Sequence, residues 1–189
     1  MAVRKGRRCA PLGQPHREFL VAEISRLVPI AQDERNAMAR VGRFLIDSLL
    51  WCWTADGIDA AGNAVRDGLK YDLRHQRHTA AAHEIWVANG FRGAGLRHEH
   101  AVPRRVLLEH LLTLEAPLPG TVAAVLEPFC FAVIVSKAED AELRRRRLSE
   151  SMPEGWTFAA GAGTSMARYV AAELAGTVRT PDGLLTGAG

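Results

Sequence analysis

The sequence lacks a long hydrophobic run and has few cysteines and aromatic residues. No apolar stretch approaches the roughly 20 residues that cross a bilayer, and the basic N-terminus is not followed by the apolar segment of a signal peptide. The three cysteines, Cys9, Cys52 and Cys130, form no CxxC pair, so we expect reduced thiols rather than a disulfide framework. These absences predict a cytoplasmic protein without a membrane partner.

What is present is the composition of an ordinary globular protein. The 189 residues are 48% hydrophobic and 24% charged, which is enough apolar material for one domain with its own core. Residues 1–15 are basic with Gly and Pro, and residues 177–189 are rich in Gly and Thr. We therefore expect a flexible basic arm over 1–15, a single globular domain over 16–176 and a flexible tail over 177–189.

Apolar periodicity predicts that most of the domain is helical. A first helix should run from Pro15 to Pro29, and residues 32–53 should form the longest helix. The expected core stripe of that longest helix is Met38, Val41, Leu45, Leu49 and Trp53. Further helices are expected over residues 60–69, 79–88, 104–115 and 137–148, in a short piece ending near Pro128, and in a last segment up to Leu174.

One segment is a clear β-strand. Residues 129–135 read FCFAVIV, a continuous run of aromatic and β-branched residues. Because a strand needs a partner, residues 96–102 are expected to pair with it. Ser136 and Glu139 then have the S-x-x-E spacing of a capping box, which begins a helix at Lys137. The predicted fold is an α-rich α+β domain with about six helices around a small sheet of two or three strands.

Histidines are concentrated in the middle of the chain. Six of the seven lie between His75 and His110, and His98 and His100 share one face of the segment if it is extended. Such a pair can chelate Zn²⁺ with a third ligand, for which Cys130, Glu99 and a histidine of residues 75–83 are candidates. Imidazole also transfers protons and contacts phosphates near neutral pH.

The run EHAVP at residues 99–103 resembles the D/E-H-x-x-P entry of the HNH-type, or His-Me finger, nucleases. In that family the histidine ends a strand and is the general base for a water that attacks a phosphodiester. A second strand follows, and then a helix that supplies the remaining metal ligand. Here the predicted strand 129–135 and the helix from Lys137 stand in that order, although a helix over 104–115 lies between the two strands.

The resemblance implies a metal-dependent endonuclease, which is a hydrolase. Its general base would be His100, with His98 beside it as a second catalytic histidine. Glu99 and a carboxylate of the later helix, Asp140 or Glu139, would hold a divalent metal such as Mg²⁺, Mn²⁺ or Zn²⁺. The later helix departs from the family pattern because it has no histidine or asparagine ligand.

Arginines are the candidate phosphate contacts. The net charge is +3, and the isoelectric point of about 9.0 is compatible with a nucleic-acid partner. Arg104 and Arg105 follow the EHAVP run directly, and Arg144 and Arg145 begin an uninterrupted run of four arginines. We predict that these four bind phosphate. Equally, the run of four can be a helix C-terminus whose cations complement the helix dipole.

Two functions remain open at this stage. The leading hypothesis is a metal-dependent nuclease or phosphodiesterase that acts on DNA or RNA. The alternative is a non-catalytic module that binds nucleic acid, a protein partner or a second copy of the chain, in which the histidines are structural. In the alternative, Glu99 and His100 are a hydrogen-bonded pair that fixes a turn. Cleavage abolished by EDTA and by His100→Ala would support only the nuclease.

Overall fold

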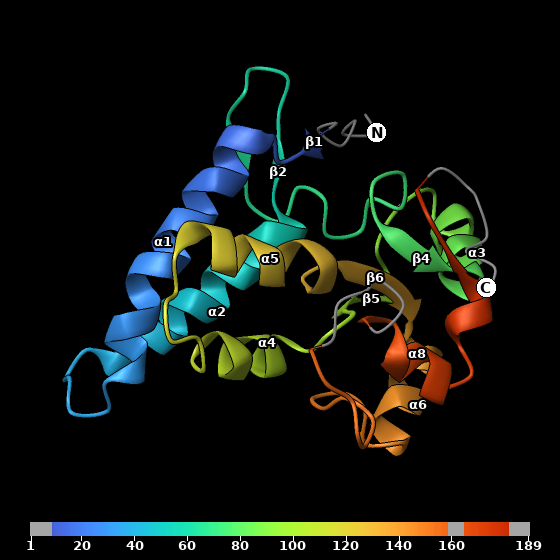
Figure 1. Cartoon of the computed structure of the whole chain (residues 1–189). Helices are drawn as coiled ribbons and strands as arrows, with labels where there is room; N and C mark the ends of the chain where they lie inside the picture. The colour runs from blue at the N-terminus through green and yellow to red at the C-terminus, as the bar shows by residue number, and fades with distance from the viewer. Residues whose placement is uncertain (1–8, 159–164, 182–189) are drawn as a thin grey trace.

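Helices make up one half of the fold, and a small sheet with its own covering helices makes up the other (Figure 1). The computed structural model describes residues 9–158 and 165–181. Within these ranges the chain forms a three-stranded and a four-stranded sheet among its helices. The predicted α-rich α+β class is therefore confirmed, with more strands than the two or three expected.

The helical half consists of α1 (Gln14–Gln32), α2 (Ala39–Ala55), α4 (Arg104–Leu111) and α5 (Pro119–Phe129). α1 continues past Pro29 and is longer than α2, so the prediction that residues 32–53 form the longest helix is wrong. No helix in the described ranges combines the length and apolar composition needed to cross a membrane. The core between these helices includes Ile24, Val28, Ile46, Leu50, Leu107 and Leu126.

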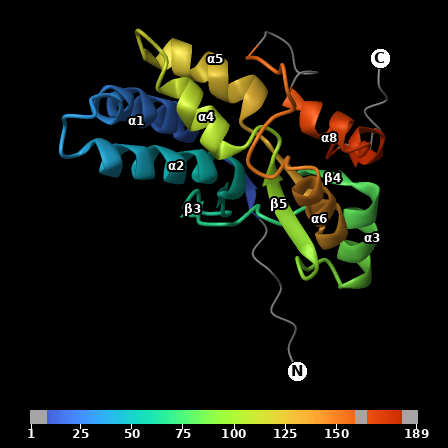
Figure 2. The same ribbon diagram turned by 90° about the horizontal axis from the view of Figure 1, so that it is seen from below.

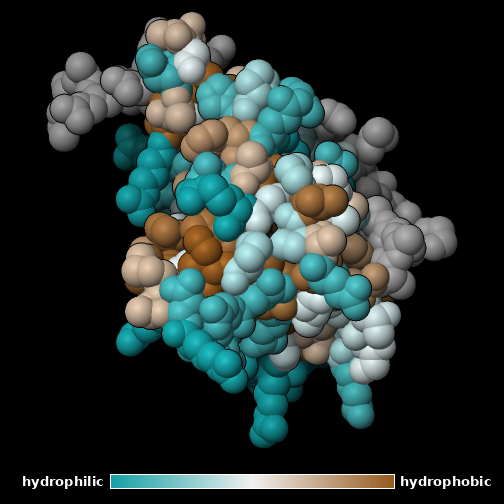
Figure 3. Space-filling view, turned by 60° about the vertical axis from the view of Figure 1, so that its left-hand side comes forward, coloured by the Kyte–Doolittle hydropathy of each residue, from teal (hydrophilic) through white to brown (hydrophobic). Residues whose placement is uncertain are grey.

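α2 buries only the C-terminal part of the predicted stripe, because Trp53 is buried and Leu49 packs against the core. A Cβ at Gly42 would lie 3.3 Å from the Cβ of Ala31, so these two small residues let α1 and α2 approach closely. The stripe that contains Gly42 therefore faces α1, and Met38, Val41 and Leu45 remain exposed. Large apolar residues remain on the molecular surface, and on the face shown in Figure 3 brown hydrophobic residues lie among teal hydrophilic ones.

The four-stranded sheet has the order β5 (Leu96–His100), β6 (Ala132–Ser136), β4 (Arg77–Thr79) and β7 (Val178–Arg179). β5 and β6 are antiparallel, with His98 opposite Ile134. The predicted pairing of the two sequence segments is confirmed. β6 begins later than predicted because the chain up to Phe129 belongs to α5.

Two helices begin directly after the parallel strands β4 and β6, namely α3 (Ala80–Ala88) and α6 (Lys137–Arg145). The predicted capping box is confirmed, since Ser136 Oγ accepts from the Glu139 N–H at 3.2 Å and Glu139 Oε2 accepts from the Ser136 N–H at 2.8 Å. The hydroxyl of Thr79, the N-cap of α3, donates to the same Glu139 oxygen at 2.7 Å. Glu139 thus joins the starts of both helices.

The predicted helix over residues 60–69 is wrong. This region instead contributes β2 (Gly57–Ile58) and β3 (Ala64–Val65), which pair with each other. Asp59 does not cap a helix, because its carboxylate accepts from the backbone N–H groups of Ala61 and Asn63 and closes the turn between the strands. Gly62 in this turn has a φ of +84°, which helical residues do not adopt.

Both ends of the described chain join sheets. β1 (Ala10–Pro11) pairs with β2, and β7 pairs with β4 after the short helices α8 (Ala167–Ala171) and η1 (Ala175–Thr177). The folded region therefore extends beyond residues 16–176 at both ends. Most of the predicted arm and tail, residues 1–8 and 182–189, lie outside the described ranges.

Candidate functional site

A pocket of about 350 Å³ opens where α2, β5 and the start of α4 meet. Figure 2 shows these three elements side by side, with α6 next to β5. The segment after α6 and residue Arg168 of α8 complete the wall. The lining residues are Asp47, Trp51, His98, Glu99, His100, Pro103, Arg104, Arg105, Ser149, Glu150 and Arg168. Five of the nine sequence-predicted site residues are in this set.

The two predicted catalytic histidines lie side by side on one face of β5. The strand alternates, so His98 and His100 point toward α2 and their ring centroids are 5.4 Å apart. The ring of Trp51 on α2 packs 5.0 Å from His98 and 5.8 Å from His100. The predicted shared face is confirmed, and Trp51 forms its cover.

A hydrogen bond to a residue of α2 holds the His100 ring in place. Its Nε2 lies 3.0 Å from the hydroxyl of Thr54 on α2, and only 6% of its surface is exposed. Burial lowers the pKa of His100 well below its usual value, and the neighbouring His98 lowers it further. His100 is therefore a neutral imidazole at pH 7 that is fixed in orientation.

His98 differs because neither of its ring nitrogens has a hydrogen-bond partner among the described residues. It is 8% exposed and lines the pocket. Burial lowers the pKa of His98 to about 4, so the ring is neutral at pH 7. A buried polar group without a partner is unfavourable. The His98 ring lines the pocket, but both of its nitrogens lie below the accessible surface, so the side chains around the ring have to shift before a bound group can contact them.

Glu99 points to the other face of β5, where it meets Arg168. The Arg168 guanidinium donates to Glu99 Oε2 at 3.1 Å and to the carbonyls of Leu148 and Ser149 at 2.8 and 3.0 Å. Burial raises the pKa of Glu99, while the charge of Arg168 opposes that rise. Arg168 is fully buried. No motif in the sequence connects Arg168 with Glu99, which lies 69 positions earlier.

The carboxylates predicted to share a metal ion have separate partners. Asp140 is buried and lies 2.6 Å from Arg144 and 3.5 Å from Arg97. Glu139 belongs to the capping box and contacts Thr79. Neither Asp140 nor Glu139 lines the pocket with Glu99.

The described residues contain no group of three or more His, Cys, Asp or Glu side chains that could hold a metal ion. Cys130, the candidate thiolate ligand, is buried, and this burial raises its pKa to about 12. Its Sγ donates to the carbonyl of Leu50 at 3.8 Å, and Cys130 does not line the pocket with the histidines. The divalent metal therefore stays a prediction for which these side chains offer no preformed site.

Arg104 and Arg105 lie at the N-terminus of α4, at the edge of the pocket. No side chain caps this end, so its backbone N–H groups face outward with the positive end of the helix dipole. Arg104 pairs with Asp47 at 2.9 Å, and Arg105 pairs with Glu109 at 2.9 Å. A guanidinium has five N–H donors, so each pair uses only part of the arginine.

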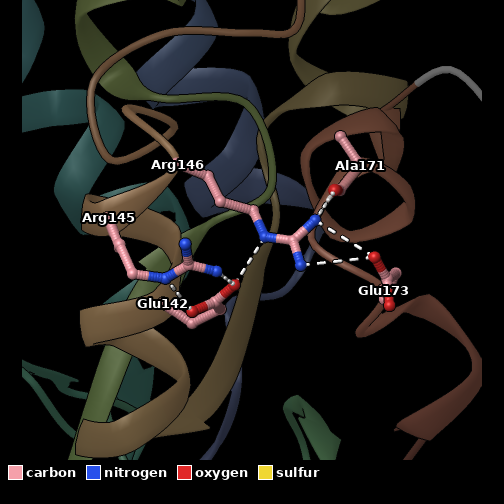
Figure 4. Close-up of polar contacts among 5 residues, drawn as sticks. All are labelled: Glu142, Arg145, Arg146, Ala171 and Glu173. Carbon is pink, nitrogen blue, oxygen red and sulfur yellow. Dashed lines mark hydrogen bonds and ion pairs between the residues drawn. The ribbon is translucent and has the colours of Figure 1, made fainter.

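The first three arginines of the run near the end of α6 form ion pairs within the protein. Glu142 accepts hydrogen bonds from Arg145 and Arg146, and Arg146 also reaches the carbonyl of Ala171 at 2.6 Å and Glu173 at 3.3 Å (Figure 4). These hydrogen bonds hold the pKa of Glu142 down at about 2. They connect α6 with α8, which favours the structural interpretation of the run.

Arg144 and Arg145 do not line the pocket. Arg144 pairs with Asp140, and Arg145 pairs with Glu142. Of the four predicted phosphate contacts, the structure thus brings Arg104 and Arg105 to the pocket of the histidines and leaves the other two outside its lining.

No protein-family model, curated protein or solved structure matches this chain. The resemblance of residues 99–103 to HNH-type nucleases stays a prediction. His100 is the last residue of β5, and β6 and α6 come later in the chain, but the two helices α4 and α5 lie between β5 and β6.

Proposed function

We propose that the chain is a nuclease or phosphodiesterase that binds a nucleic-acid phosphodiester in the pocket and hydrolyses it. The observation that carries this proposal is the convergence of two neutral histidines with Arg104, Arg105 and Arg168 on one cavity of about 350 Å³. Arginine and uncapped helix N–H groups bind phosphate oxygens. Neutral imidazole is the form that accepts a proton.

The two histidines take different roles in this proposal. The hydroxyl of Thr54 occupies His100 Nε2, whereas both ring nitrogens of His98 lack a partner. His98 is thus the candidate base, although the sequence pattern assigns that role to His100, and a water molecule reaches the buried nitrogens of His98 only when the pocket opens around the ring. His100 positions the neighbouring ring through their contact at 5.4 Å. A bound phosphate would raise the pKa of His98, because a nearby negative charge favours the imidazolium.

In the proposed step, the oxygen of a water molecule attacks phosphorus and its proton passes to His98. The bond between phosphorus and the leaving oxygen breaks, and that oxygen carries the displaced electron pair. The guanidinium groups of Arg104 and Arg105 stabilise the negative charge on the phosphoryl oxygens. No step is assigned to a metal, because Glu99, Asp140 and Glu139 each have another partner.

Cleavage assays on labelled single-stranded DNA, RNA and duplex DNA test this function, each with Mg²⁺, Mn²⁺, Zn²⁺ or EDTA. The double variant Arg104→Gln/Arg105→Gln should bind and cleave at least about tenfold less well, since hydrogen bonds to charged groups contribute about 1.5–3 kcal/mol each. The matched control is Arg26→Gln/Arg35→Gln, which removes the same charge from two exposed residues outside the pocket and should leave cleavage unchanged. Absence of cleavage under every condition would refute the proposal.

One observation favours the non-catalytic alternative. The hydrogen bond of His100 to Thr54 and the deep burial of both histidines are also what a structural pair would show. If the two histidines are only structural, the pocket binds the phosphates of a nucleic acid but does not cleave the strand. Nucleic-acid binding that depends on Arg104 and Arg105, with no product under any metal condition, would establish this alternative.

A further inference from the structure

A stripe of α2 leads from the pocket to the surface. Arg40, Phe44, Asp47 and Trp51 are spaced i, i+4, i+7 and i+11, which places them on one face of the helix. Asp47 and Trp51 line the pocket. Phe44 therefore lies about one helical turn beyond the pocket wall, roughly 5.4 Å along the axis.

Phe44 is exposed over 68% of its surface, more than the other large hydrophobic side chains of the described chain. The buried face of α2 is made by Gly42, Ile46 and Leu50, so the packing of this helix does not use the Phe44 ring. An exposed phenyl ring offers a π-face to a flat partner. Nucleobases stack on such rings with about 1–3 kcal/mol per base.

The charges beside Phe44 favour an anionic partner. Arg40, one turn before Phe44, is exposed, and Arg104 and Arg105 stand at the pocket edge on α4, which packs against α2. The acid of the stripe, Asp47, is paired with Arg104. A ring flanked by arginines on both sides suits a polymer that alternates bases and phosphates.

On the basis of the proposed function, we infer that the pocket takes an unpaired nucleic-acid strand, with one base stacked on Phe44 and a phosphate further along the strand held at His98 and the start of α4. Trp51, which packs against His98, lies seven residues after Phe44, roughly 10.5 Å along the helix axis, and this span corresponds to about three nucleotides at about 3.4 Å each. In a duplex the bases are stacked on one another inside the helix. Their faces are then closed to Phe44, so an intact duplex loses this contact.

Fluorescence anisotropy with a labelled dT12 strand, its duplex with dA12, and a strand with abasic sites measures the contact. Wild-type protein should bind the single strand more tightly than the duplex or the abasic strand. Phe44→Ala should weaken single-strand binding about 5- to 140-fold, the equivalent of 1–3 kcal/mol. Phe44→Trp should restore it, because the indole also stacks. Phe19→Ala removes another exposed ring, on α1 and 62% exposed, and should have no effect.

Each alternative outcome identifies what has failed. If Phe44→Ala binds dT12 as wild type does, while wild type still cleaves, the stacking inference is wrong and the proposed function stands. If no strand or duplex binds at all, the proposed function fails as well. If Phe44→Ala changes the oligomeric state in sedimentation and leaves dT12 binding unaltered, the Phe44 face is a contact between copies of the chain, which also overturns the inference.

Discussion

The guanidinium of Arg168 lies 3.1 Å from the carboxylate of Glu99, across 69 positions of sequence. This ion pair joins α8 to the middle of β5, on the side of the strand opposite the histidine pair. Arg168 also holds the carbonyls of Leu148 and Ser149, so one buried side chain fixes three parts of the pocket wall. The C-terminal part of the chain is therefore necessary for the shape of the site.

Replacing Arg168 should destabilise the protein strongly. Arg168→Met leaves Glu99 and two carbonyls without their donor, and breaking a buried pair by removing one partner costs about 3–5 kcal/mol. Urea unfolding measures the loss. Arg26→Met is the control, because Arg26 forms an exposed pair with Glu23, and such pairs contribute about 0–1 kcal/mol.

A double variant keeps this prediction testable if Arg168→Met does not fold. Adding Glu99→Gln removes the charge that Arg168 neutralised, so Arg168→Met/Glu99→Gln should recover part of the stability. Equal losses for Arg168→Met and Arg26→Met would contradict the structural role of the pair.

Acid should destabilise the fold through His98. The pKa of His98 is about 4 in the folded protein, compared with 6.5 for an unperturbed histidine such as that of the unfolded chain. The unfolded chain therefore binds a proton first as the pH falls. The contribution of His98 to the free energy of unfolding is then fully present above pH 6.5. It declines toward pH 4 by about 1.4 kcal/mol per pH unit. His100 and His78 act in the same direction because burial lowers their pKa values too.

Urea unfolding between pH 7.5 and 4.5 measures the slope of the unfolding free energy against pH. His98→Asn should reduce this slope by the equivalent of about one bound proton. Glu99 works in the opposite direction, since its raised pKa makes the folded state bind a proton before the unfolded state does. Its contribution is common to wild type and His98→Asn and cancels in the comparison. Identical slopes for the two proteins would show that His98 is not buried as a neutral ring.

Thr54 should be required for the position of His100. Thr54→Val keeps the shape of the side chain but leaves Nε2 of a buried ring without its partner at 3.0 Å. The expected loss of stability is about 1–3 kcal/mol. Thr54→Ser retains the hydroxyl and should stay close to wild type. A valine variant as stable as the serine variant would mean that water satisfies His100 instead.

Short-range patterns predicted the parts of the fold that depend on neighbouring residues. The capping box of Ser136 and Glu139 needs only the spacing of those two side chains, and it forms as expected. The shared face of His98 and His100 follows from the alternation of a strand. In both cases the geometry is complete within a few residues, so tertiary contacts do not change it.

Long-range packing decided the features that the sequence did not reveal. α2 has two apolar stripes, and the close approach of Gly42 to Ala31 determines which one is buried. Arg168 reaches Glu99 only after the chain has formed the sheet and returned through α8. In the sequence, Glu139 matches the pattern of a helix cap and also that of a metal ligand. Its bonds to Ser136 and Thr79 show that the cap uses it.

The rate of phosphodiester cleavage by His98→Asn, compared with wild type and His83→Asn, tests the central claim most directly. His83 stacks on His78 outside the pocket, so His83→Asn controls for the loss of a histidine. Removal of a general base lowers the rate about 10²- to 10⁴-fold. We expect that loss for His98→Asn, with a wild-type rate for His83→Asn. Equal rates for His98→Asn and wild type, with folding intact, would contradict the account.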